Sequence, residues 1–155
     1  MRIPLLISLA ITAVTLHTSC AFRQPSAGIL TNSEKEAAHA IALLSQSCAD
    51  AWNRGDLKAF LVPYADDVVI VYASGPEKGI LSLEARLRRS QRWDGQPPQN
   101  LARIGHSEVS LLDSVHALQT AEIIMREPTR DVHLWVTALL KKTSRGWIVI
   151  HEQSF

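Results

Sequence analysis

The sequence has few residues of the kinds that would build a covalent or metal-held scaffold. Its 155 residues contain two cysteines, too few for a disulfide framework, and no CxxC or HxxxH spacing indicates a structural zinc site. We therefore expect neither a metal nor a cofactor. The charges also nearly cancel, because 16 Lys and Arg face 15 Asp and Glu for a formal net charge of +1. Proteins that bind nucleic acid are usually strongly basic, so we expect no nucleic-acid partner.

The longest charge-free run near the start is too short to cross a membrane comfortably. Residues 3–16 carry no charge, but this run of 14 residues falls below the roughly 20 that a bilayer core requires. After the positive start Met1-Arg2, it is typical of a secretory signal peptide. We therefore predict a leader over residues 1–21, a flexible linker over 22–32 and an exported protein.

Two ways of processing this leader stay open. Ser19 and Ala21 are the small residues that ordinary signal peptidase requires for a cut after Ala21. Alternatively, Cys20 is lipidated as in bacterial lipoproteins, although these usually carry Leu three positions earlier, where this chain has His17. The product is then either free in the periplasm or anchored to the membrane through the leader or a lipid on Cys20. In both cases Cys48 stays unpaired in the body of the protein.

The remaining residues, 33–155, indicate one domain, because 46% of the chain is apolar and 20% is charged, as in globular proteins. Its first part is helical. Ser33 and Glu36 form a capping-box pattern, and apolar residues then recur at helical spacing to about Asn53. A short helix over 56–60, a buried strand over 68–72 and a third helix from Ser82 follow.

The last third consists of strand-like runs separated by short turns, which makes them antiparallel neighbours. Helices first and an antiparallel sheet last predict an α+β fold, with the helices packed on one face of the sheet. The four predicted strands cover residues 101–112, 115–127, 132–143 and 147–154.

Both faces of this sheet are apolar, whereas a sheet with one wet face should alternate cleanly. The strand over 132–143 sets His133, Trp135 and Thr137 against an aliphatic face. By strict alternation, the last strand places His151 and Gln153 on the face of Trp147 and opposite Glu152. A second apolar face requires cover, so we predict a homodimer through the sheet.

Three motifs in register resemble one superfamily. They are Trp52-Asn53-Arg54-Gly55-Asp56-Leu57, Tyr64-Ala65-Asp66-Asp67-Val68 and the run over residues 146–152. In order and spacing they are similar to the nuclear-transport-factor-2-like superfamily, in particular its SnoaL-like bacterial branch, over Ser33 to Phe155. The resemblance implies a cone-shaped α+β barrel, with three N-terminal helices packed on a curved, mainly antiparallel sheet around an apolar pocket. It also implies frequent dimerisation through the sheet, but no particular reaction, because this fold serves enzymes and non-enzymes alike.

The resemblance can be tested against the ketosteroid isomerases of this fold. Counted from the shared motifs, their oxyanion-binding tyrosine corresponds to Cys48 and their general-base aspartate to Tyr72. A thiol is a poor donor to an enolate and a neutral phenol is a poor base, so both replacements argue against isomerase chemistry. The Arg-Asp-Asp set of the epoxide hydrolases of this fold has no match that can be placed.

Candidate ligand-binding residues come from the aromatic and polar side chains that could face the cone. They supply an apolar body with a few hydrogen-bonding groups, as small-molecule pockets require. A rim histidine and a core tryptophan are the alternative interpretation. His151, His133 and Tyr72 are also the weak catalytic candidates. The full set is Trp52, Tyr64, Tyr72, Trp93, His133, Trp135, Thr137, His151 and Gln153.

Other conspicuous groups have simpler structural explanations. The Asp66-Asp67 pair is typical of a turn that faces water, and Cys48 lies in the apolar stripe of the first helix. In the third helix we expect Leu83 and Leu87 to point inward. Arg86, Arg88, Arg89 and Arg92 should form a largely solvated basic surface.

The leading hypothesis is an exported domain that binds a small apolar molecule in its cone. One alternative is a lyase, isomerase or hydrolase that uses a pocket histidine and tyrosine. Another is a structural or protein-interaction module that uses the second sheet face.

Overall fold

A computed structural model gives the fold and describes residues 30–74, 78–91 and 94–155. The predicted leader, most of the predicted linker, Arg92 and Trp93 lie outside these residues. Within the described part, no helix is both long and apolar enough to span a membrane. The three predicted helices are present as α1 (Asn32–Arg54), α2 (Leu57–Leu61) and α3 (Leu83–Ser90).

The three helices start where side chains satisfy their first backbone donors. The capping box of α1 uses Thr31 and Glu34, not the expected Ser33 and Glu36. The backbone N–H of Thr31 donates to Glu34 Oε2 at 2.7 Å, so the helix begins at Asn32, one residue inside the predicted linker. Asp56 and Ser82 cap α2 and α3 as their sequence positions predict.

The strands form one six-stranded sheet in the order β2-β1-β6-β5-β4-β3. All neighbours are antiparallel except β1 and β6, which are parallel. The short strand β2 was not predicted, because its four residues carry too little pattern to identify a strand. The strands are β1 (Tyr64–Tyr72), β2 (Gly79–Ser82), β3 (Leu101–Leu111), β4 (His116–Arg126), β5 (Asp131–Thr143) and β6 (Gly146–Ser154).

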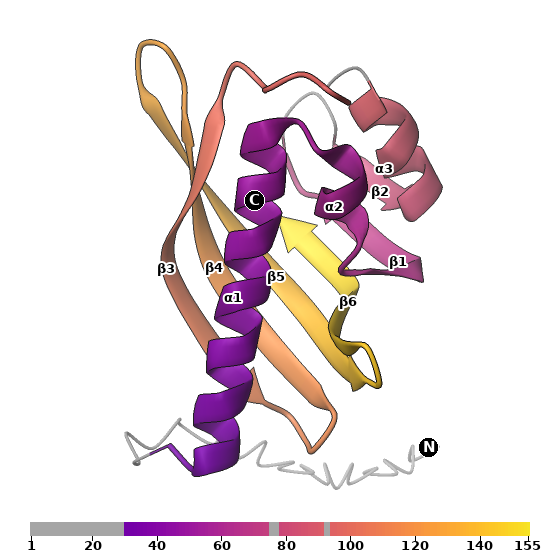
Figure 1. Ribbon diagram of the computed structural model, residues 1–155, viewed down its shortest axis with the longest axis vertical. Coiled ribbons are helices and arrows are strands. Elements are labelled where there is room, and N and C mark those ends of the chain that lie inside the picture. Colours follow the sequence, from indigo (N-terminus) through magenta and orange to yellow (C-terminus); the bar gives the residue numbers. More distant parts are fainter. Residues whose placement is uncertain (1–29, 75–77, 92–93) are drawn as a thin grey trace, which may run out of the picture.

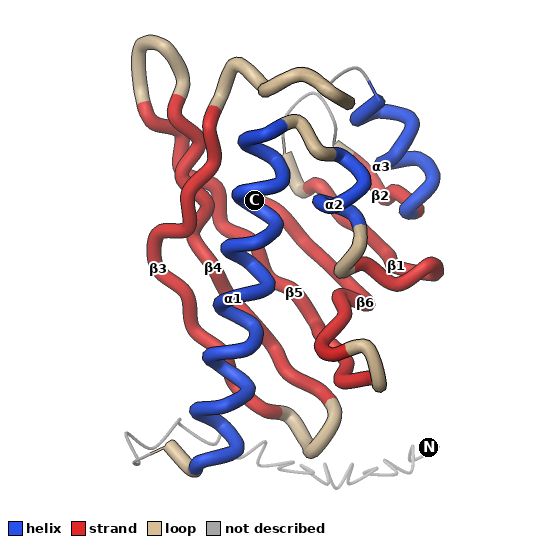
Figure 2. The backbone as a smooth tube through the Cα atoms, in the orientation of Figure 1, coloured by secondary structure: helices blue, strands red, loops and turns tan. Residues whose placement is uncertain are grey.

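The helices all lie on one side of the sheet, as predicted. The long helix α1 runs across the face of β3 to β6, and α2 and α3 gather beside β1 and β2 (Figure 1). The tube view shows the same two layers, with the sheet strongly curved around α1 (Figure 2). We call the face toward α1 the inner face and the opposite one the outer face.

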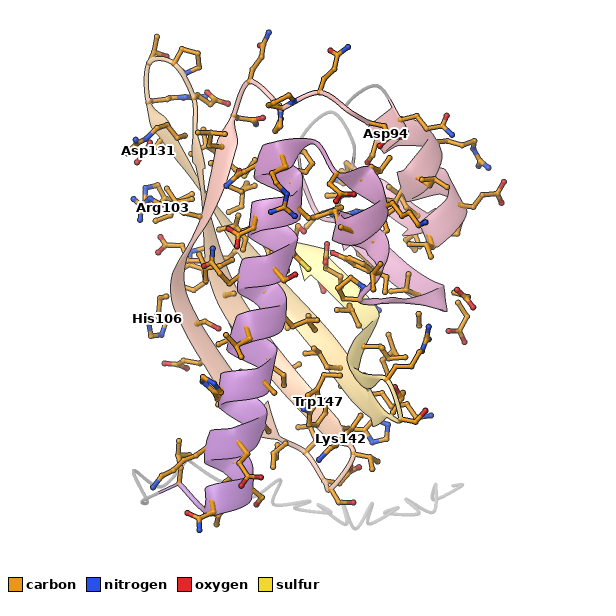
Figure 3. All side chains as sticks on the ribbon, viewed as in Figure 1. Asp94, Arg103, His106, Asp131, Lys142 and Trp147 are labelled. Carbon is orange, nitrogen blue, oxygen red and sulfur yellow. The ribbon has the colours of Figure 1, made fainter. Side chains whose placement is uncertain are left out.

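The core fills only part of the space between the two layers. Ala37 and Ile41 of α1 pack with Leu140, Trp147 and Val149 of the sheet, all buried. Trp147 lies beside the N-terminal half of α1, whereas Arg103, His106 and Asp131 project from the β3 side of the sheet (Figure 3). A smaller cluster of Ala51, Leu57 and Phe60 joins α1 to α2. A cavity lies beside both clusters and is lined by Leu140 and Val149 of the first and by Phe60 of the second.

Candidate ligand-binding site

The cavity has a volume of about 490 Å³ and lies between α1, α3 and the inner face of the sheet. This is the size of a pocket for a small organic molecule. Its walls are mostly aliphatic, because every second residue of β4 and β5 points into it. Examples are Ala121, Ile123, Leu134, Val136 and Ala138.

A buried charge pair stands in this apolar wall. Arg86 of α3 donates from Nη1 to Oε1 of Glu152 on β6 at 3.0 Å, and the two side chains are only 11% and 9% exposed. The same nitrogen donates to Tyr72 Oη at 2.6 Å. Tyr64 donates its hydroxyl to Oε2 of Glu152 at 2.5 Å. Both carboxylate oxygens of Glu152 therefore have donors, which offsets the cost of burying its charge.

Three aromatic rings enclose the guanidinium of Arg86. Its Cζ lies 5.1 Å from the ring centre of Phe60, 5.3 Å from that of Tyr64 and 5.7 Å from that of Tyr72. At these distances the negative ring faces attract the cation. The rings also hold the guanidinium in place. We refer to the four hydrogen-bonded residues Arg86, Glu152, Tyr64 and Tyr72 as the polar cluster.

The polar cluster shifts several pKa values in the directions that burial and charge require. Burial, and then the nearby charge of Glu152, raise the pKa of the Cys48 thiol to about 12. Burial also raises the pKa of Tyr64 well above its usual range. Burial alone would lower the pKa of Arg86, but the oxygens of Tyr64, Glu152 and Tyr72 together raise it. At neutral pH the arginine is therefore charged, and Cys48 and Tyr64 are protonated.

A second polar group lies on the inner face of β4. The buried amide of Gln119 donates from Nε2 to Ser45 Oγ of α1 at 2.9 Å and to Ser107 Oγ of β3 at 3.0 Å. Strand register places Gln119, Ala138 and Glu152 in one row across three neighbouring strands. Because adjacent strands lie about 4.8 Å apart, Gln119 and Glu152 are separated by about 10 Å, with only a small alanine between them.

A β-bulge explains why Glu152 faces the cavity. Leu140 pairs with Val149 and Leu139 with His151, so Ile150 is an extra residue in β6. A bulge of this kind exchanges the two faces for every residue beyond it. Glu152 therefore joins Trp147 and Val149 on the inner face, and His151 and Gln153 move to the outer face.

The end of α1 is fixed to the loop beside the cavity. Asn53 pairs with the backbone of Ala102 through two hydrogen bonds of 2.7 and 2.8 Å. The indole N–H of Trp52 donates to the carbonyl of Asn100 at 3.0 Å. Gly55 has a left-handed φ of 68° and lies so close to Gln96 that a Cβ at this position would be 2.2 Å from its carbonyl oxygen. These contacts hold the last turn of α1 and the start of β3 as one wall.

Comparison with solved structures identifies the fold. The chain is similar to the association domain of CaMKII from C. elegans, with a TM-score of 0.66 and 14% identity, over 80% of this chain and 98% of that one. An NTF2-like protein of unknown function from Pseudomonas putida matches with a TM-score of 0.64 and 20% identity, over 82% and 88%. An NTF2-like protein of unknown function from Shewanella oneidensis matches with a TM-score of 0.60 and 17% identity, over 75% of this chain and 96% of that one.

The chain has the nuclear-transport-factor-2-like fold. The predicted cone-shaped α+β architecture is thereby confirmed. No family model and no curated protein sequence matches the chain. Since these structural identities are all low, the NTF2-like likeness concerns the fold and leaves the reaction or ligand to be argued from the site.

The NTF2-like cone contains only part of the predicted lining. Trp52, Tyr64 and Tyr72 do line the cavity, and Trp93 lies outside the described residues. The expectation for the five remaining residues needs correction, because the structure places all of them on the outer face. They are His133, Trp135, Thr137, His151 and Gln153.

Two different causes produced this error. On β5 the inner face is the aliphatic one of Val132, Leu134 and Val136, and nothing in the alternation distinguishes the two faces. On β6 the bulge at Ile150 broke the alternation. His133 is exposed and contacts Glu122 at 2.7 Å, a hydrogen bond that lowers the pKa of this glutamate. Neither histidine lines the cavity, so the catalytic role suggested for His151 and His133 has no pocket there in which to act.

The important residues that the sequence did not reveal are Arg86 and Glu152. Arg86 was expected on a solvated surface, but α3 turns it inward and leaves Leu87 at 38% exposure. The nearby Ser90, one helical turn further along, is buried at 4%. The expected exposure of Asp66, Asp67 and Arg88 is confirmed. The Asp pair does not form a turn, however, because β1 (Tyr64–Tyr72) begins before the strand predicted over 68–72 and includes both residues. The side chains of Arg89 and Arg92 lie outside the description. Among the described residues, no cluster of His, Cys, Asp or Glu could hold a metal ion.

Proposed function

We propose that the protein is an exported domain that binds a small, largely apolar molecule in its cone. The observation that carries this proposal is the cavity of about 490 Å³, with aliphatic walls and one fixed polar cluster. Small-molecule sites have this composition, because the apolar walls supply affinity and a few polar groups fix orientation. The predicted leader supports export, and membrane contact would come only through that leader or a lipid on Cys20.

Binding is favoured over catalysis by the state of the polar groups. Both oxygens of Glu152 already accept hydrogen bonds from Tyr64 and Arg86, so this carboxylate is a poor general base. Cys48, with its pKa raised to about 12, is protonated and therefore a poor nucleophile. The fixed groups suit recognition of a polar atom on a bound molecule.

Thermal unfolding with and without small neutral aromatic and alicyclic compounds tests this proposal. A compound that binds only the folded state raises the melting temperature, by an amount that corresponds to about 2.7 kcal/mol at a hundred times its Kd. We expect at least one member of such a panel to give a shift of several degrees in a circular-dichroism melt.

A matched pair of variants shows whether the shift comes from the cavity. Ala138→Phe fills the floor between Glu152 and Gln119 and should abolish the shift. Thr137→Phe adds a larger side chain at the neighbouring position on the outer face and should keep it. Absence of any shift across the panel, or an equal shift with Ala138→Phe, would refute a ligand in the cone.

We also propose a homodimer through the outer face. Large apolar side chains are exposed there on four of the six strands, β2, β1, β5 and β4. They are Ile80, Val69, Trp135 and Leu118. Exposed apolar surface of this extent is typical of an interface.

A further inference from the structure

The guanidinium of Arg86 uses only one of its three nitrogens for hydrogen bonds to the described residues. Both bonds, to Tyr72 and Glu152, leave from Nη1. No buried side-chain nitrogen or oxygen among the described residues lacks a partner, so Nε and Nη2 are not sealed in the protein. Arg86 lines the cavity. An arginine carries five N–H groups, and the three on Nε and Nη2 make no hydrogen bond to the described residues.

These donors are held ready for a ligand. The rings of Phe60, Tyr64 and Tyr72 surround the guanidinium, and Glu152 holds it from the sheet side. A fixed donor group loses little conformational freedom when it binds, so more of its hydrogen-bond energy contributes to affinity.

The charges around Arg86 decide what kind of acceptor fits. The charged residues among the described lining are Arg86, Glu152 and Glu127, so the carboxylates already compensate the arginine. An anionic ligand would add a negative charge beside Glu152 in surroundings of low dielectric, which is costly. A neutral oxygen acceptor takes the same hydrogen bonds without adding charge, and bonds to a charged donor are the stronger kind.

The floor of the cavity sets the shape of the molecule behind that oxygen. Ala138 lies between Glu152 and Gln119 in the row across the sheet, and its small side chain leaves space above it. An apolar ring system lying over Ala138 would contact the aliphatic residues of β4 and β5 while its oxygen reaches Arg86.

We propose that the cavity selects a neutral, ring-sized apolar molecule that carries a carbonyl or similar acceptor oxygen. This oxygen accepts hydrogen bonds from Nε and Nη2 of Arg86, and Glu152 discriminates against the corresponding carboxylate. The inference rests on the proposed ligand-binding function and adds the chemical class of the ligand.

Three naphthalenes substituted at the same ring position provide the test. Acetylnaphthalene carries a neutral carbonyl, isopropylnaphthalene has nearly the same shape without an acceptor, and naphthoate is an anion at neutral pH. We expect calorimetric titration to show the ketone binding at least about tenfold more tightly than the hydrocarbon, the effect of one hydrogen bond to a charged donor. Naphthoate should bind at least about tenfold more weakly than the ketone.

Variants then assign the preference to the charge pair. Glu152→Gln keeps the shape of the side chain but leaves the charge of Arg86 uncompensated, so naphthoate should gain at least about tenfold in affinity. The double variant Arg86→Met with Glu152→Leu removes both charges, and the ketone and the hydrocarbon should then bind equally. It also avoids an unpaired buried charge, so it stays informative if Glu152→Gln does not fold. Arg88→Met, on the exposed side of the same helix, should keep the original ranking.

The possible outcomes separate this inference from the proposed function. Equal binding of the ketone and the hydrocarbon would overturn the inference and leave a ligand-binding cone. Tightest binding of naphthoate to the unchanged protein would overturn the role of Glu152 in the same way. Failure of all three compounds to bind would count against the binding function itself, and the inference would fall with it.

Discussion

At the scale of single residues, Arg86 and Glu152 form a charge pair that matters for folding as well as for recognition. Each is about nine-tenths buried, and removal of one partner leaves the other charge buried and unpaired. We therefore expect Glu152→Ala to lower the free energy of unfolding by about 3–5 kcal/mol. The double variant Arg86→Met with Glu152→Leu should lower the free energy of unfolding much less, because it removes both charges and leaves neither one buried without a partner. Urea denaturation measures both values.

The matched control for this experiment is Arg88→Ala. Arg88 pairs with Glu84 on the exposed side of α3, and an exposed pair of this kind contributes about 0–1 kcal/mol. A loss for Glu152→Ala as small as that for Arg88→Ala would show that the buried pair does not support the fold.

The same pair shows which residues of the site a sequence can reveal. Tyr64 and Tyr72 could be proposed for the cavity because aromatic side chains are typical of the lining of small-molecule pockets. Arg86 could not, because an arginine in a helix rich in arginine is usually solvated. Its inward position follows from contacts with the rings and with Glu152, which lie far away in the sequence. Contacts between residues so far apart in the sequence cannot be predicted from a local sequence pattern.

At the scale of elements, the turn after α1 positions one wall of the cavity. Gly55 combines a φ of 68° with a site where a Cβ would meet the backbone of Gln96 at 2.2 Å. Gly95 has nearly the same backbone, with a φ of 74°, but no atom within 4 Å of its own Cβ position. Gly55→Ala should therefore destabilise the protein by about 1–2 kcal/mol from backbone strain and by a further steric term.

Gly95→Ala is the control, because it introduces the same backbone strain without a steric clash of the new Cβ. Thermal melts of both variants should show Gly55→Ala clearly below Gly95→Ala, with ligand binding weakened in the former as the loop at Gln96 is displaced. Equal melting temperatures would mean that the loop yields freely and does not help to shape the wall.

Elements were predicted better than the faces they present. Alternation and turn residues were sufficient to locate the helices and the four strands β3 to β6, since each depends on local pattern. The bulge at Ile150 depends on pairing with β5, and it exchanged the inner and outer residues at the end of β6. Glu152 was thereby missed and His151 proposed in its place. A single unpaired residue thus changed the predicted chemistry of the site while leaving the predicted fold intact.

At the scale of the whole molecule, the outer face of the sheet remains to be covered. Leu118, Leu139, His151 and Val69 form one row across four strands, and Trp135 is 43% exposed nearby. Burying such a surface against a second copy would remove a large apolar area from water and close a symmetric pair. We therefore expect the unchanged protein to have the mass of two chains in solution.

The test is light scattering on Leu118→Glu at micromolar concentration. A carboxylate at the β4 end of the row would be buried without a partner in the dimer, so the mass should fall to that of one chain. Binding of a cone ligand should persist, because Leu118 faces away from the cavity. Arg145→Glu, in the exposed turn between β5 and β6, adds the same side chain elsewhere and should stay dimeric. If the unchanged protein has the mass of a single chain, the dimer is excluded and the outer face is free for a different partner.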